Sequence, residues 1–139
     1  MTRIKVAAGI ILRQSVSNPQ AHQTRQILIA KRPNDKHQGG LWEFPGGKIE
    51  INESPEQALE RELQEEINIG VLKSQFFQQI DFNYSDKNVS LLFYLVSEFS
   101  GELHGVEGQE VRWVFVSDLS QYDFPSANQE IVTRLQEIF

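Results

Sequence analysis

One short stretch of the chain combines a glycine turn, strong helix signals and a high density of negative charge. It spans residues 46–69 and reads GGKIEINESPEQALERELQEEINI. Seven of the nineteen acidic residues of the protein lie between Glu50 and Glu66. Like charges this close on a helix repel one another. The stretch therefore predicts a local structure in which a group of opposite charge sits among the carboxylates.

Local signals place one amphipathic helix in this stretch. Ser54 is a favourable N-cap, Pro55 suits the first helical position, and Gln57 completes a capping box with Ser54. We expect the helix to run to about Ile67 and to close at Asn68, which tolerates the left-handed conformation. At ~100° per residue the helix has two adjoining faces, an apolar one of Leu59, Leu63 and Ile67 and an acidic one of Glu62, Glu65 and Glu66, with Ala58 among the glutamates.

The acidic face favours a site for a hard divalent cation. Carboxylate oxygens at this density suit magnesium, and carbonyl oxygens of the preceding glycine turn would add hard ligands. The alternative is a solvated face, which is the usual meaning of a Glu-rich helix surface. Solvated faces commonly carry Glu-to-Lys pairs at i,i+4 spacing, and almost none occur here. The residues on their own leave both interpretations open.

Composition limits the class of protein. The chain has 139 residues, of which 40% are hydrophobic and 23% charged, as is ordinary for one globular domain. It has no cysteine, so disulfide, thiolate and zinc-thiolate chemistry are excluded. No apolar stretch approaches the ~20 residues needed to span a bilayer, and the apolar residues 6–12 are too short for a signal peptide. We expect a single domain, residues 1–139, in the cytoplasm.

The net charge of −6 bears on the partners of the protein. Duplex nucleic acid would be repelled on average, and no basic stripe with interleaved aromatics is present. A phosphate-bearing small molecule stays compatible with this charge if metal ions mediate the contact. We therefore expect a free nucleotide as partner, no duplex nucleic acid, no membrane, and a monomer.

The order of elements predicts an α+β fold. A second helix is expected at residues 127–139, where apolar side chains recur at helical spacing. A long polar loop is expected at residues 14–24. Hairpins combined with two helices indicate helices packed on a mostly mixed or antiparallel sheet. Its strands are expected at residues 4–12, 26–31, 41–44, 75–83, 88–96 and 111–116.

The acidic stretch resembles the Nudix box. That motif is Gly, five residues, Glu, seven residues, Arg-Glu, an aliphatic, any residue, Glu-Glu, any residue, Gly and an aliphatic. The family has glycine where this chain has Asn68, and asparagine is the next best residue at positive φ. Eight of the nine defined positions fit, namely Gly47, Glu53, Arg61, Glu62, Leu63, Glu65, Glu66 and Ile69.

The likeness extends over nearly the whole chain and is greatest with the MutT subgroup, the 8-oxo-dGTP diphosphatases. The similar stretches are residues 6–10, 43–50, 54–58, 107–109 and 123–128, and the loop at residues 14–24 is the main divergence. The resemblance implies the Nudix fold, an α/β/α sandwich around a mixed β-sheet. It also implies that metal-activated water hydrolyses 8-oxo-dGTP to the monophosphate and pyrophosphate, which cleanses the nucleotide pool.

Three alternatives to that activity stay open. The first is a Nudix hydrolase of other nucleoside triphosphates or of nucleoside diphosphate derivatives. The second is a non-catalytic nucleotide-binding sensor, although the complete Arg-Glu-x-x-Glu-Glu core argues against it. The third, outside the family, is a structural protein whose acidic helix is merely solvated.

The resemblance also implies the residues of the metal site. Magnesium or manganese is expected at Glu62, Glu65 and Glu66, with the Gly46 carbonyl and Glu107 adding ligands. Glu107 has the alternative of a solvated loop residue. Two further roles follow from the family pattern, a proton acceptor for the attacking water (Glu62 or Glu107) and a pair that braces the loop against the helix (Glu53 and Arg61).

Asn128 matches the MutT residue that reads the purine, with a helix cap as the alternative. Its amide has an acceptor oxygen and a donor NH₂, so it can accept from N7–H of 8-oxoguanine and donate to O6. In guanine, N7 is itself an acceptor and would face the amide oxygen. Other positions that match the nucleotide site are Arg32, His37 and Phe44, together with Lys87, which stands where the resemblance suggests arginine and would lose bidentate geometry on a phosphate.

Overall fold

Seven strands form one mixed sheet in the computed structural model, which describes residues 3–14, 25–33 and 39–139. The strand order is β3-β2-β1-β6-β5, with β4 paired to β1 and β7 paired to β2. Strands β1 and β6 run parallel, whereas the other pairs are antiparallel. The strands are β1 (Arg3–Gln14), β2 (Arg25–Lys31), β3 (Trp42–Glu43), β4 (Gly46–Lys48), β5 (Gly70–Asn83), β6 (Asn88–Ser100) and β7 (Val111–Phe115).

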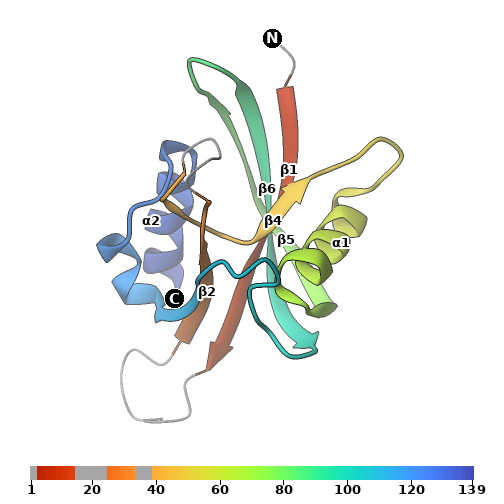
Figure 1. The fold of residues 1–139 in the computed structure, drawn as a ribbon. Helices are drawn as coiled ribbons and strands as arrows, with labels where there is room; N and C mark the ends of the chain where they lie inside the picture. The colour runs from red at the N-terminus through yellow and green to blue at the C-terminus, as the bar shows by residue number, and fades with distance from the viewer. Residues whose placement is uncertain (1–2, 15–24, 34–38) are drawn as a thin grey trace.

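Two α-helices cover opposite faces of this sheet (Figure 1). They are α1 (Pro55–Ile67) and α2 (Gln129–Ile138), and two short 3₁₀ helices, η1 (Val116–Gln121) and η2 (Ser126–Asn128), precede α2. The α/β/α arrangement around a mixed sheet confirms the expected α+β fold class. Within the described part of the chain, neither helix has the length and apolar character that crossing a membrane requires.

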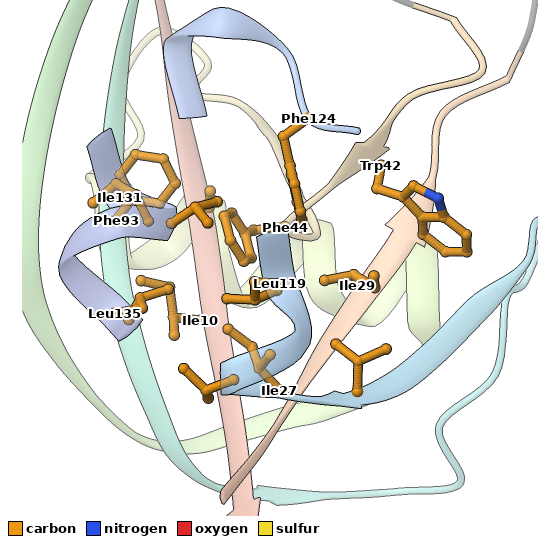
Figure 2. Packing of buried hydrophobic residues seen from close by; sticks show 14 of the residues in the cluster. Ile10, Ile27, Ile29, Trp42, Phe44, Phe93, Leu119, Phe124, Ile131 and Leu135 are labelled. Carbon is orange, nitrogen blue, oxygen red and sulfur yellow. The ribbon is translucent and has the colours of Figure 1, made fainter. Parts of the chain in front are cut away.

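Strand β1 separates two hydrophobic cores because its successive side chains point to opposite faces. Ala8 and Ile10 belong to the core beneath α2, and Ala7 and Ile11 belong to the core beneath α1. Figure 2 shows the first core, where Phe44 lies between the strand residues and Phe124. Both cores draw on the same central strand, so the two helices are held at fixed positions relative to the sheet.

The local signals of α1 are confirmed. Ser54 Oγ accepts from the Gln57 backbone N–H at 3.1 Å, and Gln57 Oε1 accepts from the Ser54 backbone N–H at 2.9 Å. Asn68 ends the helix at φ 61° and ψ 36°. The expected place of Ala58 on the acidic face was wrong, since its side chain is fully buried in the core beneath α1.

Some element bounds differ from those expected. Strand β5 begins at Gly70, five residues before the predicted start, and runs along the sheet edge through several register irregularities. Residues 46–48 form the short strand β4 in place of a simple turn. The second helix starts as the 3₁₀ turn η2 and becomes α-helical only at Gln129. The loop expected at residues 14–24 lies outside the described residues except for Gln14, which ends β1.

Candidate active site

The glycine pair of β4 brings strand β1 and helix α1 into close approach. A β-carbon on Gly46 would lie 2.0 Å from the Ala7 carbonyl oxygen, and one on Gly47 would lie 2.2 Å from the Glu62 carboxyl carbon. Real β-carbons do not tolerate such distances. The absence of side chains at these two positions therefore lets the Glu62 carboxylate lie directly over β4.

Arg61 is the electrostatic centre of the acidic helix. Its Nε and Nη2 donate to the two carboxylate oxygens of Glu53, at 2.7 and 3.0 Å, and its Nη1 donates to Glu62 Oε1 at 2.8 Å. Nη2 also donates to the Lys48 carbonyl at 3.0 Å. Glu65 lies at 3.4 Å from Nη1 on the exposed side. One guanidinium thus joins β4, the following loop and α1, and it holds Glu62 by a charge-assisted hydrogen bond.

The carboxyl end of α1 anchors the loop that carries Glu107. The Glu66 carbonyl accepts from the Val106 backbone N–H at 2.9 Å and from Gln109 Nε2 at 3.1 Å. Gln109 Oε1 in turn accepts from the Glu107 backbone N–H at 3.0 Å. Glu107 and Glu66 therefore line one cavity of about 270 Å³, together with Glu43 and Gly46.

The carboxylates in this cavity repel one another. The pKa of Glu66 is raised to about 8, first because the side chain is buried, and then because Glu43, Glu62 and Glu107 are negatively charged. The pKa of Glu43 is also raised, chiefly by burial, although Arg32 opposes the shift. A bound cation would reverse this repulsion, since it favours the ionised form of each carboxylate.

The carboxylate and carbonyl oxygens of this cavity fit a hard divalent ion, and its lining also includes Lys31 and Arg32. In the side-chain arrangement described, however, no group of three or more His, Asp or Glu side chains is gathered closely enough to hold a metal ion. Hydrogen bonds explain why the carboxylates lie apart. Arg61 draws Glu62 and Glu65 toward itself, and Glu66 Oε2 accepts from the Gly46 backbone N–H at 3.2 Å. A metal ion held by these carboxylates would require them to turn away from their present donors.

A second cavity, of about 240 Å³, adjoins the first on the side of the sheet nearer α2. Its lining includes Phe44, Lys87 and Asn128. Asn128 is only 8% exposed, and its side chain makes no capping hydrogen bond to α2. Among the described residues no group is hydrogen-bonded to this amide. Buried amides are nearly always paired in proteins, with protein groups or with ordered water, so this amide is available to a group that enters the cavity.

Arg32 and Glu43 stand where the two cavities meet. Arg32 Nη1 and Glu43 Oε2 form an ion pair of 2.5 Å, and both residues line both cavities. Phe44, the next residue, is buried and stacks on Phe124 with ring centroids 5.1 Å apart. Phe44 is thus a core residue and a cavity wall at once. A cation at this junction can meet an anionic group that reaches from one cavity into the other.

Most predicted site residues fall into these two cavities. Arg32 and Gly46 lie at their junction, whereas Glu53 and Arg61 brace the helix beside them. His37 lies outside the described residues. Sequence reasoning missed Glu43, although an acidic residue inside the apolar run Leu-Trp-Glu-Phe is a usable signal. It also missed Tyr84, whose part in the second cavity depends on a contact that no local pattern encodes.

Comparison with known proteins agrees with this site. The NUDIX domain family model matches residues 20–134. An 8-oxo-dGTP diphosphatase of Escherichia coli (strain K12) is 36% identical over 99% of this chain and 100% of its own length. A CTP pyrophosphohydrolase of the same strain is 35% identical over 92% of this chain and 87% of its own length. A solved structure from work on MutT of Aliivibrio salmonicida and Vibrio cholerae is 45% identical, covers 99% of this chain and 100% of that chain, and has a TM-score of 0.81.

The chain therefore belongs to the Nudix family and is a Nudix pyrophosphohydrolase. This confirms the resemblance drawn from the acidic stretch. Nudix hydrolases generally need a divalent metal ion, in keeping with the oxygen donors of the first cavity.

Proposed function

We propose that this protein hydrolyses 8-oxo-dGTP to the nucleoside monophosphate and pyrophosphate. The observation that carries the proposal is the buried amide of Asn128, which lines a cavity of nucleoside size and has no partner among the described residues. An amide can accept from N7–H of 8-oxoguanine and donate to O6 at once. With guanine the amide oxygen would face a lone pair, and a buried unpaired group costs roughly 1–3 kcal/mol.

The triphosphate would extend from this cavity toward α1. Arg32, at the junction of the cavities, is the natural phosphate partner, and Lys87 offers a second cation at the cavity wall. Phe44 would bound the nucleoside on its core side. His37 completes the proposed substrate-binding set through a hydrogen bond to phosphate or sugar.

Magnesium or manganese is the proposed cofactor. Glu62, Glu65, Glu66 and Glu107, with the Gly46 carbonyl, are the residues that would hold it. The ion would neutralise phosphate charge and lower the pKa of water. The guanidinium of Arg61 and the metal ion are both positive, so they would compete for the Glu62 carboxylate.

The remaining chemistry belongs to the protein. A carboxylate, Glu62 or Glu107, would accept the proton of the attacking water. Glu53 would hold Arg61, and Arg61 would hold the Glu62 carboxylate over β4, beside the first cavity, until a cation draws it away. Attack at the β-phosphorus would break its bond to the oxygen that bridges it to the α-phosphorus, so the monophosphate leaves and the water oxygen ends in pyrophosphate. Hydrolysis in ¹⁸O-labelled water should then place the label in pyrophosphate.

A second candidate substrate is a cytidine triphosphate. The relative named CTP pyrophosphohydrolase is 35% identical to this chain, almost the same as the 36% of the relative named 8-oxo-dGTP diphosphatase. An 8-oxo-dGTP diphosphatase of Haemophilus influenzae (strain ATCC 51907 / DSM 11121 / KW20 / Rd) is 42% identical over 95% of this chain, so overall identity favours 8-oxo-dGTP only slightly. A kinetic panel of 8-oxo-dGTP, dGTP, dATP and CTP with magnesium tests the choice. We expect the largest kcat/KM for 8-oxo-dGTP, and a larger value for CTP would reverse the assignment.

Three further properties belong to the same proposal. The chain acts as a single domain over residues 1–139, as a monomer, and in the cytoplasm, where nucleotides are free. Its net charge of −6 supports a small nucleotide over duplex nucleic acid as partner. Sedimentation analysis with and without nucleotide tests the monomer, and a gel-shift assay with duplex DNA tests the preference for small nucleotides.

A further inference from the structure

We propose that Tyr84 is a positioning residue for the second cavity. Its hydroxyl fixes the segment that carries Asn128 and thereby sets the base selectivity of the cavity. This inference rests on the proposed function, because it concerns how Asn128 meets the base. Tyr84 is half-buried in the turn between β5 and β6, and its hydroxyl accepts from the Ala127 backbone N–H at 3.0 Å. Forty-three residues separate these partners in the chain.

The hydroxyl satisfies a donor that the local sequence leaves open. The first N–H groups of a helical turn have no partner within the helix and need a cap. Pro125 occupies the cap position of η2, and no side chain caps η2 from there. Ala127 is only 3% exposed, so water is a poor substitute. Tyr84 therefore supplies, from another element, the hydrogen bond that Pro125 does not provide.

The same contact joins two walls of the cavity. Tyr84 and Lys87 close the β5–β6 turn through a backbone hydrogen bond of 2.8 Å, and both line the cavity. Ala127 and Asn128 form part of the remaining lining. Among the described residues, the hydrogen bond from the Ala127 backbone N–H to the Tyr84 hydroxyl joins the turn to η2, so it sets the separation between Lys87 and the Asn128 amide.

Asn128 is held on its other sides by different means. Its backbone N–H donates to the Pro125 carbonyl at 2.9 Å, and Phe124, which precedes Pro125, is anchored by stacking on Phe44. These contacts fix where the segment begins. The Tyr84 hydroxyl fixes the residue directly before Asn128. Base reading by an amide depends on the direction of its hydrogen bonds, and so a small rotation at residue 127 weakens selectivity before it weakens the fold.

The test compares Tyr84→Phe, which removes only the hydroxyl, with Tyr122→Phe. Tyr122 also carries a hydroxyl that accepts a hydrogen bond, from Arg112 Nη1 at 3.4 Å, but it is not part of the cavity lining. Calorimetry with 8-oxo-dGMP, dGMP and CMP measures base binding without turnover. We expect the ratio between the weakest and tightest Kd values to fall about tenfold in Tyr84→Phe, in line with the loss of one buried hydrogen bond, and to stay unchanged in Tyr122→Phe.

Steady-state kinetics give the second readout. Tyr84→Phe should raise KM for the preferred nucleotide by about tenfold while kcat changes by less than about twofold, because the reacting phosphates of the proposed substrate would lie in the cavity beside α1. Thermal unfolding of both variants shows that the fold is retained. The inference would be overturned if Tyr84→Phe kept the wild-type ratio between the weakest and tightest Kd values for the three monophosphates. A wild type that binds 8-oxo-dGMP no more tightly than dGMP would instead overturn the proposed function, and the Tyr84 comparison would then be judged on the base that the wild type prefers.

Discussion

Arg61 grips both carboxylate oxygens of Glu53, at 2.7 and 3.0 Å, and with its remaining nitrogen holds Glu62 at 2.8 Å. Glu53 lies in the loop before α1, whereas Arg61 and Glu62 lie on the helix. The pair converts a repulsive row of glutamates into an ordered one. It also gives Glu62 a fixed direction before any cofactor or substrate arrives.

The Glu53–Arg61 pair predicts a dependence of stability on pH. Hydrogen bonds from Arg61 lower the pKa of Glu53 from its ordinary 4.5 to about 2. A lowered folded-state pKa gives stability that is complete above about pH 4.5 and is lost as the pH falls toward 2. We expect Glu53→Gln to lower Tm at pH 6 and to leave Tm unchanged near pH 2. Thermal unfolding followed by circular dichroism checks this, and a difference that grows toward low pH would contradict it.

Glu62→Gln should lower turnover by several orders of magnitude while the fold survives. The carboxylate is a proposed metal ligand and proton acceptor, and such groups are worth about 10²- to 10⁴-fold in rate. Arg61 keeps its two bonds to Glu53 in the variant, so we expect only a small change in Tm. Glu60→Gln, at an exposed position of the same helix, is the matched control. Pyrophosphate release measures both variants, and wild-type turnover in a folded Glu62→Gln protein would refute the role.

Replacing the two glycines of β4 by alanine should have different effects, a loss of stability at one position and a loss of activity at the other. In Gly46→Ala the new β-carbon meets the Ala7 backbone, which has no freedom to move, and we expect a loss of about 2 kcal/mol or more in the free energy of unfolding. In Gly47→Ala it meets the end of the Glu62 side chain, which can rotate. Stability should then change little while activity falls sharply. Urea unfolding and turnover, measured on both variants, separate the two effects, and equal losses of stability would contradict the distinction.

Asn128→Ala should remove selectivity without destabilising the free protein. The amide has no partner among the described residues, so its deletion breaks no hydrogen bond that the structure shows. With substrate bound, the same deletion leaves base groups unpaired, and we expect the ratio of kcat/KM for 8-oxo-dGTP to that for dGTP to fall about 10- to 100-fold. A variant that keeps the ratio of the wild type would show that another residue reads the base.

The sequence was sufficient for α1 because its limits are set by neighbours in the chain. Ser54, Gln57 and Asn68 each act within four residues of the helix end they define. Strand β4 is different, since a Gly-Gly-Lys segment has no strand preference and becomes extended only by pairing with β1. The early start of β5 was missed for a related reason. Residues 72–76 are all exposed, so no apolar alternation marks them.

The site residues also fall into those that a local motif predicts and those that depend on tertiary contacts. The residues of the acidic helix follow from one local motif, and the oxygen donors beside them could be anticipated. The Arg32–Glu43 pair and the Tyr84–Ala127 hydrogen bond join elements that only the sheet brings together. The burial of Asn128 was also beyond the sequence, because a residue that follows Phe-Pro-Ser-Ala could equally cap the helix through its side chain. The structure excludes that cap.

Binding of Mn²⁺, followed by electron paramagnetic resonance, tests the carboxylate site most directly. The account predicts that the wild type takes up Mn²⁺, that magnesium competes for it, and that Glu66→Gln weakens the affinity at least about tenfold while Glu60→Gln leaves it unchanged. The assignment of the cavity lined by Glu43, Glu66 and Glu107 as the metal centre would be contradicted by either of two results. One is a wild type that takes up no Mn²⁺ with nucleotide present, and the other is a Glu66→Gln protein that binds Mn²⁺ as tightly as the wild type.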